Sequence, residues 1–215
     1  MHIASTQAAG APAMDRRFAP RLFSPMLIRL AAPADAAGCL AIYRPFVETT
    51  HVSFETEVPS RDEFARRIES TLAQRPWLVA VDGDCVIGYA YASPVKDRAA
   101  YQWSVEVALY VAEQARRRGL GRSLYEALFR VLRGQGFVNA VGVIALPNPA
   151  SVALHESLGF EKIAHLKRIG FKRGAWHDVG WWQLQLGSEP GTPRAPDPLA
   201  SCRTRAESWL KGEKP

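Results

Sequence analysis

The chain has 215 residues, of which 47% are hydrophobic and 22% are charged, and its formal net charge is +6. This length and composition predict one globular domain with appended segments, and they exclude whole-chain disorder, a collagen, a coiled coil and a small disulfide-rich fold. The positive charge is spread along the chain, so we expect no dedicated arm for binding nucleic acid.

Three zones divide the chain. Residues 1–25 are rich in alanine, proline and arginine without periodicity, so we expect a flexible leader. Residues 26–186 alternate between strand and helix periodicity and form the predicted domain. Residues 187–198 contain four prolines and two glycines, which predicts a linker, and residues 199–215 form a polar tail that we expect to be mobile.

The predicted domain alternates strands and helices. In chain order the pattern predicts a strand at 27–30, a helix from Pro33 to Phe46, a helix at 60–74, hairpin strands at 77–81 and 85–91, a strand at 101–111, a helix at 119–134, a strand at 138–145, a helix at 148–158, and strands at 160–169 and 179–186. The order β-α-α-β-β-β-α-β-α-β-β belongs to the α/β class. It predicts a mixed sheet covered by helices, with one parallel crossover through the helix at 119–134.

The cysteines and the hydropathy pattern bear on location. Cys39, Cys85 and Cys202 fit neither a disulfide framework nor a zinc site. No apolar run is long enough to cross a membrane. We therefore expect a cytoplasmic protein that binds no metal and no membrane.

A turn rich in glycine and arginine joins the strand at 101–111 to the next helix. Its sequence is R-x-x-G-x-G from Arg116 to Gly121. Glycines allow a ligand to approach the backbone closely, and the first turn of a helix offers unpaired N–H groups at the positive end of its dipole. The turn is therefore a candidate anion site, or else a solvated basic turn. A P-loop is absent, and the dinucleotide-binding pattern G-x-G-x-x-G fails at Leu124.

Glu106 stands in the middle of the apolar strand at 101–111. Alternation turns its side chain away from Val105 and Val107. It either faces solvent on a half-exposed sheet or serves as a general base that deprotonates an amine, a role favoured when apolar surroundings raise its pKa.

Other candidate residues lie at the ends of predicted elements. Asn148 begins a helix and suits an N-cap, while His155, two turns later, is either packed or active in proton transfer. Lys96, Arg98 and Tyr101 form either a charged turn or a clamp for the carboxylate of an amino-acid-like substrate. Phe54 is a candidate wall of that pocket.

Several stretches are similar to a known family. The turn from Arg116 to Gly121 resembles the acetyl-CoA loop of the GCN5-related N-acetyltransferases, the GNAT superfamily. The stretches that resemble its phosphinothricin N-acetyltransferases are 54–57, 94–101, 103–111, 144–148, 155–160 and 170–180. The His-Glu-Ser-Leu-Gly-Phe and Trp-His-Asp-Val-Gly pieces are the most specific, and the resemblance covers about residues 26–186.

The resemblance implies the GNAT fold, acetyl-CoA as co-substrate and a homodimer. It implies direct acetyl transfer in a ternary complex to the amine of phosphinothricin, methionine sulfoximine or methionine sulfone. Glu106 would be the base, His155 would serve the leaving thiol, and Asn148 would contact the cofactor. The further cofactor contacts are expected at Leu109, Tyr110, Val111, Arg117, Arg118, Gly119, Leu120, Gly121 and Arg122. Two alternatives are an acetyltransferase that acts on a protein or peptide amine and a basic nucleic-acid-binding module.

Overall fold

The computed structural model describes residues 26–188 and 191–213, so the predicted leader at 1–25 lies outside the described residues. The helices and strands are β1 (Leu27–Leu30), α1 (Ala36–Thr49), α2 (Arg61–Gln74), β2 (Trp77–Asp82), β3 (Cys85–Pro94), β4 (Ser104–Val111), α3 (Leu120–Gln135), β5 (Asn139–Leu146), α4 (Pro149–Ser157), β6 (Glu161–Lys172), β7 (Ala175–Gln185) and α5 (Leu199–Leu210). From β1 to β7 this order confirms the predicted one.

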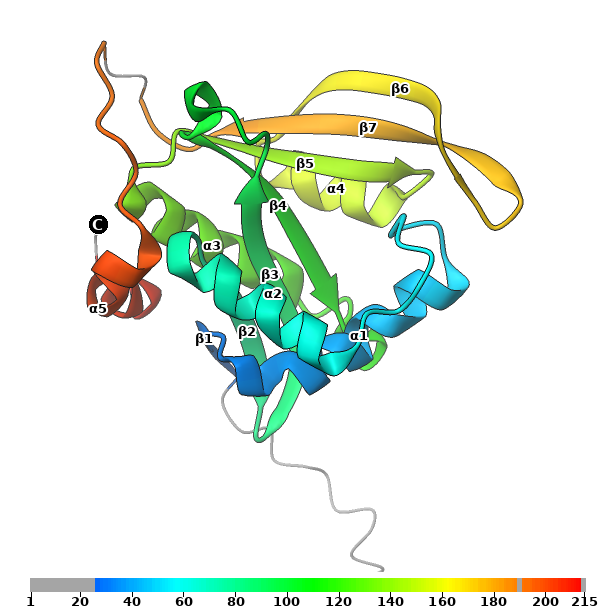
Figure 1. Cartoon of the computed structure of the whole chain (residues 1–215), viewed down its shortest axis with the longest axis horizontal. Coiled ribbons are helices and arrows are strands. Elements are labelled where there is room, and N and C mark those ends of the chain that lie inside the picture. The colour runs from blue at the N-terminus through cyan, green and yellow to red at the C-terminus, as the bar shows by residue number, and fades with distance from the viewer. Residues whose placement is uncertain (1–25, 189–190, 214–215) are drawn as a thin grey trace, which may run out of the picture.

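One mixed sheet organises the domain. Its strand order is β1-β2-β3-β4-β5-β7-β6 (Figure 1). Among the described strands only β4 and β5 pair in parallel, and α3 connects them. The predicted single crossover is therefore confirmed, and the α/β class with it.

Helices cover both faces of the sheet, and the side chains of β4 show which helices cover which face. The Tyr110 ring lies 5.0 Å from Tyr43 and 5.2 Å from Phe46, both in α1, between ring centroids. The neighbouring Leu109 faces the other way, since a Cβ built on Gly121 of α3 would lie 3.4 Å from it. Even-numbered side chains of β4 thus face α1 and α2, and odd-numbered ones face α3 and α4.

The central strands β4 and β5 pair over a short length and then separate. Their ladder joins Ser104–Glu106 to residues 139–141. Beyond it, β4 pairs with β3 and β5 pairs with β7, and the two strands diverge in Figure 1. Val143 of β5 is 36% exposed although its strand lies inside the sheet. We call this region, between residues 107–111 and 142–146, the split.

Several strand boundaries differ from the predicted ones, among them the end of β3, which reaches Pro94. The strand expected from Tyr101 begins at Ser104, because Ala99–Tyr101 form a 3₁₀ turn. The last two strands form one long hairpin, in which Arg173 and Gly174 adopt positive φ at the turn. A bulge between Leu166 and Gly170 interrupts the alternation that would have revealed this length.

The expectation of a mobile tail is wrong for Leu199–Leu210, which forms helix α5. The helix buries Leu199, Cys202, Ala206 and Trp209, and the spacing of these residues is that of one helical face. Trp209 lies against Gly134 of α3, where an added Cβ would come within 2.5 Å of the ring. The buried face contains few apolar residues, so the polar composition of the segment did not indicate a packed helix.

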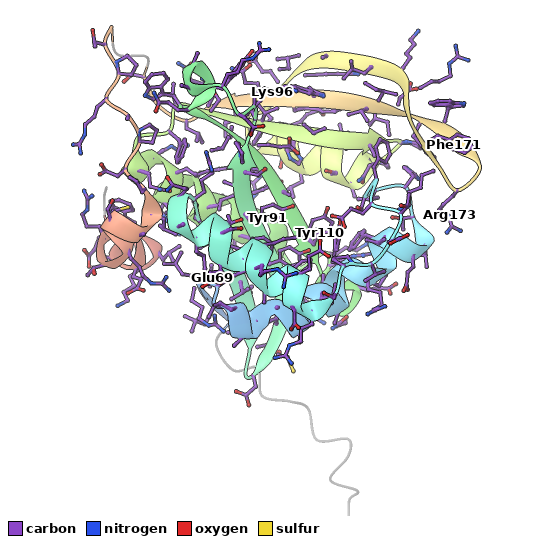
Figure 2. All side chains as sticks on the ribbon, viewed as in Figure 1. Glu69, Tyr91, Lys96, Tyr110, Phe171 and Arg173 are labelled. Atoms are coloured by element: carbon purple, nitrogen blue, oxygen red, sulfur yellow. The ribbon has the colours of Figure 1, made fainter. Side chains whose placement is uncertain are left out.

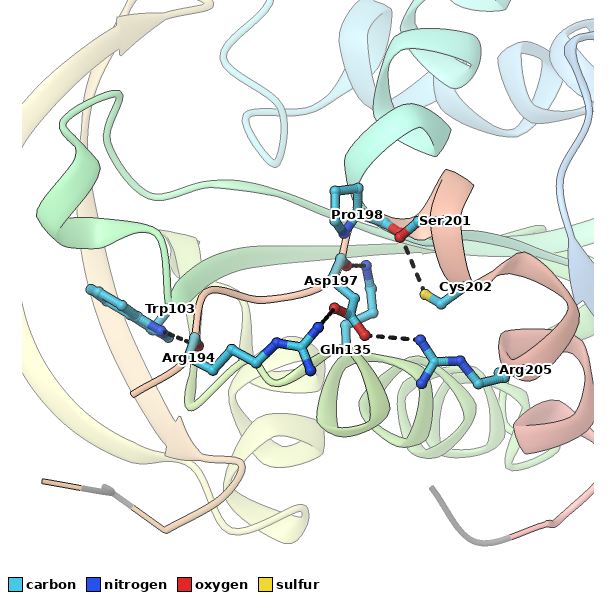
Figure 3. Close-up of polar contacts among 8 residues, drawn as sticks. All are labelled: Trp103, Gln135, Arg194, Asp197, Pro198, Ser201, Cys202 and Arg205. Carbon is cyan, nitrogen blue, oxygen red and sulfur yellow. Dashed lines mark hydrogen bonds and ion pairs between the residues drawn. The ribbon is translucent and has the colours of Figure 1, made fainter. Parts of the chain in front are cut away.

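The segment before α5 is also held against the domain, as Figure 3 shows. The side-chain amide of Gln135 donates to the carbonyl oxygen of Asp197 at 2.7 Å, and the indole of Trp103 donates to that of Arg194 at 2.8 Å. The Asp197 carboxylate accepts hydrogen bonds from Arg194 and Arg205. Within the described part of the chain, no helix has the length and apolar character needed to cross a membrane.

Candidate active site

Glu106 lies at the point where β4 and β5 separate. It pairs with Val141 of β5 and with Ser93 of β3, and its side chain is on the face of α1 and α2. Burial raises the pKa of its carboxyl group, while the positive charge of Lys96 opposes the shift. Among the described residues the carboxylate accepts no hydrogen bond. A carboxylate that is partly desolvated and uncommitted suits proton abstraction better than a structural role.

His155 lies on the opposite face of the sheet from Glu106. Its ring packs on Gly142 of β5, where an added Cβ would come within 2.6 Å, and Gly142 follows Val141, which shares the face of Glu106. The Nδ1 atom donates to the carbonyl oxygen of Ser151 at 2.8 Å, and Nε2 accepts from the hydroxyl of Tyr125 at 3.2 Å. Burial lowers the pKa of His155, so the ring is neutral.

His155 is packed in the interior, as one of its two interpretations predicted, since it is only 4% exposed. Tyr125, its hydroxyl partner, is a residue that sequence reasoning overlooked. The one signal was its place on the apolar face of α3, which predicts core packing rather than a polar contact.

Asn148 is the N-cap of α4, as one of its two interpretations predicted. Its side-chain oxygen accepts a hydrogen bond from the backbone N–H of Ser151 at 3.2 Å. The side-chain amide nitrogen is not used in this cap.

The glycine- and arginine-rich turn has a backbone suited to anions. Gly119 adopts φ 74° at the N-cap of α3. The N–H of Ser123 makes the bond to the Gly119 carbonyl, so the three amides before it, at Leu120, Gly121 and Arg122, have no partner within the helix. Gly121 is held closely, because an added Cβ would lie 3.1 Å from Leu154.

The arginine side chains contribute less to this turn than their spacing indicated. Arg122 donates to the carbonyl and hydroxyl oxygens of Ser157, both at 2.9 Å, and so ties α3 to the end of α4. The guanidinium of Arg116 lies 5.4 Å from the ring centroid of Phe46. The guanidinium groups of these two residues are thus engaged within the protein, and the groups left for a ligand at the turn include the backbone amides of residues 120–122.

The predicted substrate residues fall into two groups. Lys96, Arg98 and Tyr101 are exposed in the connection that leads into β4, where Figure 2 labels Lys96, and the charge of Lys96 acts on Glu106. Phe54 comes from another part of the chain, the loop between α1 and α2, and its ring lies against Gly170 and 6.3 Å from that of His177.

The sheet register locates the His177 contact of Phe54 along β5. Glu106 is level with Val141, whereas His177 precedes Asp178, the partner of Leu146. Five residues of β5 span about 16 Å. The His177 and Gly170 contacts of Phe54 therefore lie toward the open end of the split. Besides burial, the charges of Glu106 and of Glu55, the next residue in the loop, both raise the pKa of Tyr91, so the expectation that Phe54 walls the acceptor pocket stays a prediction.

Sequence reasoning also overlooked an aromatic layer next to Glu106. Tyr91 of β3 is level with Ala108, and its ring stacks on Trp77 at 4.2 Å between centroids. Figure 2 labels Tyr91 and Tyr110, which lie between the sheet and helices α1 and α2. The alternation of Tyr89 and Tyr91 on β3 was the available signal.

A cavity of about 190 Å³ adjoins this layer. It is lined by Tyr43, Glu55, Phe64, Arg67, Ser70, Thr71, Trp77, Tyr89 and Tyr91. Arg67 is held there by Glu55, at 2.7 Å, and by Glu63. The described residues contain no cluster of side chains able to hold a metal ion.

The comparisons with known proteins agree with this geometry. The model of the acetyltransferase (GNAT) domain family matches residues 28–181. A phosphinothricin N-acetyltransferase of Streptomyces viridochromogenes is 42% identical over 175 residues, which cover 81% of this chain and 95% of that protein. An L-methionine sulfoximine/L-methionine sulfone acetyltransferase of Pseudomonas aeruginosa is 36% identical, with 77% of this chain and 98% of that protein covered.

Solved structures give the same result for the fold. A GNAT superfamily phosphinothricin acetyltransferase from Sinorhizobium meliloti, crystallised in complex with AcCoA, has a TM-score of 0.76 at 36% identity, and the match covers 80% of this chain and 94% of that one. The motifs, the split sheet and these matches lead to one conclusion: the chain belongs to the GNAT family of acetyltransferases and has its fold.

Proposed function

We propose that this acetyltransferase moves the acetyl group of acetyl-CoA directly to the α-amine of a small amino-acid-like acceptor. Phosphinothricin, methionine sulfoximine and methionine sulfone are the proposed acceptor types, because relatives that are 42% and 36% identical are named for them. The observation that carries the proposal is Glu106, a partly buried carboxylate of raised pKa at the start of the split.

The residues around the split suit acetyl-CoA. The edge of β4 at Leu109, Tyr110 and Val111 has no strand partner on the side of β5, so its backbone groups are available to the amide-bearing arm of the ligand. The free amides of residues 120–122, with Gly119 and the backbone of residues 117–118, suit the pyrophosphate. The unused amide of Asn148 is a further proposed contact.

Glu106 would supply the proton transfer that the reaction needs. An amine of pKa about 8–10 is mostly protonated at neutral pH and has no lone pair with which to attack. A carboxylate with a raised pKa accepts that proton, directly or through a water molecule. A backbone N–H on the edge of β4 would then hydrogen-bond the oxygen of the acetyl group as negative charge develops there.

His155 is proposed to serve the leaving thiolate, although it does so from the other face of the sheet. Because Nδ1 donates to Ser151 and Nε2 accepts from Tyr125, a proton can pass between the imidazole and the thiolate only along the Tyr125 hydroxyl or after these bonds rearrange. His155 thus acts in this proposal as a neutral partner that orients a donor.

Lys96 and Arg98 support a free amino acid as acceptor. Both side chains are exposed, and the charge of Lys96 acts on Glu106. The planar guanidinium of Arg98 can bind a carboxylate through two hydrogen bonds. Tyr101 lies in the same turn, and Phe54 closes the far end of the split. A peptide acceptor has no carboxylate next to its amine, which disfavours it.

A protein acceptor is nevertheless the second candidate. A structure from Brucella melitensis that is named a ribosomal-protein-alanine N-acetyltransferase is 34% identical, with a TM-score of 0.72. An acceptor panel that includes peptides with N-terminal alanine separates the two candidates.

We also propose that the protein is a cytoplasmic homodimer. Ile163, Ile169, Phe171 and Trp176 are each more than half exposed on the hairpin of β6 and β7, and clustered apolar side chains of this size commonly lie in interfaces. Three free cysteines suit a reducing compartment. Light scattering after size exclusion measures the mass of the assembly, and a monomer would contradict the dimer.

The acceptor is tested by the release of free thiol from acetyl-CoA. The panel comprises the common amino acids, phosphinate, sulfoximine and sulfone analogues, and peptides with a free N-terminus. We expect the highest kcat/KM for an analogue with tetrahedral oxygens on its side chain. Release that depends only on peptides would contradict the proposed acceptor class.

A further inference from the structure

A lysine at the end of β6 is buried with its ammonium group bonded to backbone carbonyl oxygens. Burial lowers its pKa, while the acidic charge of Glu55 raises it. Lys172 is 7% exposed, and its ammonium group donates to the carbonyl oxygens of Val47 and Ser53, each at 2.7 Å. Among the described residues it forms no ion pair. Burying an ammonium group is unfavourable unless its hydrogen bonds are satisfied, so this arrangement indicates a specific role.

One of the two carbonyl groups belongs to the end of α1 and the other to the loop that follows it. Val47 is in the last turn of that helix, and Ser53 lies in the middle of residues 50–59, which we call the bridge loop. The bridge loop is anchored at its helical side by the bond of 2.6 Å between Tyr43 and Ser53 and by the pairing of Glu55 with Arg67. Lys172 adds an anchor from the opposite half of the sheet.

Residues near Lys172 also contact the end of α1 and the bridge loop. Arg173 donates to the carbonyl oxygen of Glu48 at 2.7 Å, and Figure 2 shows it at the hairpin tip near α1. The rings of His51 and His177 stack at 4.5 Å with an interplanar angle of 7°. His177 donates to the carbonyl oxygen of Lys172 at 3.0 Å.

These contacts fix the position of Phe54. Its ring occupies the space above Gly170, where an added Cβ would be 2.1 Å from the ring. Gly170 and Lys172 share one face of β6, while Phe171 is on the other face and 60% exposed. Phe54 of the bridge loop therefore packs on the backbone at Gly170, and Lys172, two residues further along β6, donates a hydrogen bond to the same loop.

The bridge loop crosses the open end of the split. Helix α1, from which it starts, packs on β4 through Phe46 and Tyr110. At its other side His51 contacts the carbonyl oxygen of Pro147, just after β5, at 3.2 Å. The separated ends of β4 and β5 are thus joined by this loop.

We propose that Lys172 is a positioning residue for the acceptor: its ammonium group fastens the bridge loop across the split and so fixes Phe54 as the far wall of the acceptor site. The inference rests on the proposed function, which puts the acceptor in the split. Lys172 would touch neither acetyl-CoA nor the reacting amine, so its effect is confined to acceptor binding.

The test is Lys172→Met, which keeps most of the side-chain length and removes the ammonium group. We expect the KM for the acceptor to rise about tenfold or more, the range for losing hydrogen bonds from a charged group. The KM for acetyl-CoA and the kcat at saturating acceptor should stay within about twofold. The matched control is Lys167→Met, an exposed position on the same strand, which should change neither constant.

Hydrogen exchange gives a second readout that needs no acceptor. Amides of the bridge loop should exchange faster in Lys172→Met than in the wild type or in Lys167→Met. Gly170→Ala, which leaves Lys172 in place, should displace the Phe54 ring and also raise the acceptor KM.

Unchanged loop exchange in Lys172→Met, or an unchanged acceptor KM in both Lys172→Met and Gly170→Ala, would overturn the proposal. An equal rise of the acceptor and acetyl-CoA KM would do so too, since it indicates general loosening. If the wild type acetylates no free amino acid, the proposed function fails, whereas the exchange data still decide whether Lys172 fastens the loop.

Discussion

Glu106 and Val141 are the last partners in the short parallel ladder between β4 and β5. From this pair onward each strand bonds only to its outer neighbour. The carboxylate thus sits where two sheet edges become available to a ligand, next to backbone groups that can bind a thioester arm. This single relationship connects the fold of the GNAT family to the chemistry proposed for the chain.

The pH dependence of the reaction should report the Glu106 carboxyl group. The active form of a base is the deprotonated one, and burial raises its pKa, so kcat/KM should rise with pH through a value above that of an exposed glutamate. Steady-state rates between about pH 5 and 9 measure this limb. A profile of the same shape in Glu106→Gln would assign the limb to another group.

Glu106 should also lower the stability of the free enzyme near neutral pH. Since its pKa is raised in the folded state, folding favours the protonated form, and stability falls as pH rises through that pKa. Glu106→Gln should therefore have a higher Tm than the wild type at pH 8, with a smaller difference at pH 4. Calorimetric scans at both pH values test this, and a lower Tm for the variant at pH 8 would contradict the sign.

Gly121→Asp should weaken the binding of acetyl-CoA. The new side chain meets Leu154 within 3.1 Å and Leu109 within 3.4 Å, and its negative charge opposes a phosphate at the start of α3. Titration calorimetry should show at least a tenfold loss of affinity. Gly187→Asp, which adds the same charge where no atom lies within 4 Å of the added Cβ, is the control. Equal affinity of both variants for acetyl-CoA would count against a phosphate site at the start of α3.

Helix α5 should stabilise the domain although it lies beyond the match to the family model. Trp209 is 4% exposed, and Trp209→Ala should lower the free energy of unfolding by about 3–5 kcal/mol. The exposed Arg203, whose one ion pair among the described residues is with Glu207, provides the control Arg203→Ala, expected to change the free energy of unfolding by less than about 1 kcal/mol. Denaturant unfolding measures both, and equal effects would show that α5 is not part of the core.

The sequence predicts the order of elements well because each helix and strand has its own periodicity. The turn at Gly119 was predictable for the same reason, since its glycines lie between a strand and a helix. Alternation along β4 predicted the direction of Glu106 relative to Val105 and Val107, and the burial of those two valines agrees. These features depend on near neighbours in the chain.

Features that depend on distant segments could not be predicted. Predicting the split requires knowing where the ladder between β4 and β5 stops, and the sequence of either strand alone does not contain that information. The contact of the Phe54 ring with Gly170 of β6 joins two segments more than 100 residues apart in the chain. Lys172 has the sequence of a charged hairpin tip, and only the packing of the bridge loop buries it.

The most direct test of the account compares binding and turnover in Glu106→Gln. The variant keeps the shape of the side chain and removes the base, so we predict unchanged affinity for acetyl-CoA by calorimetry and a fall in kcat of about 100-fold or more. Turnover equal to that of the wild type across the pH range would contradict the central claim that Glu106 deprotonates the acceptor amine.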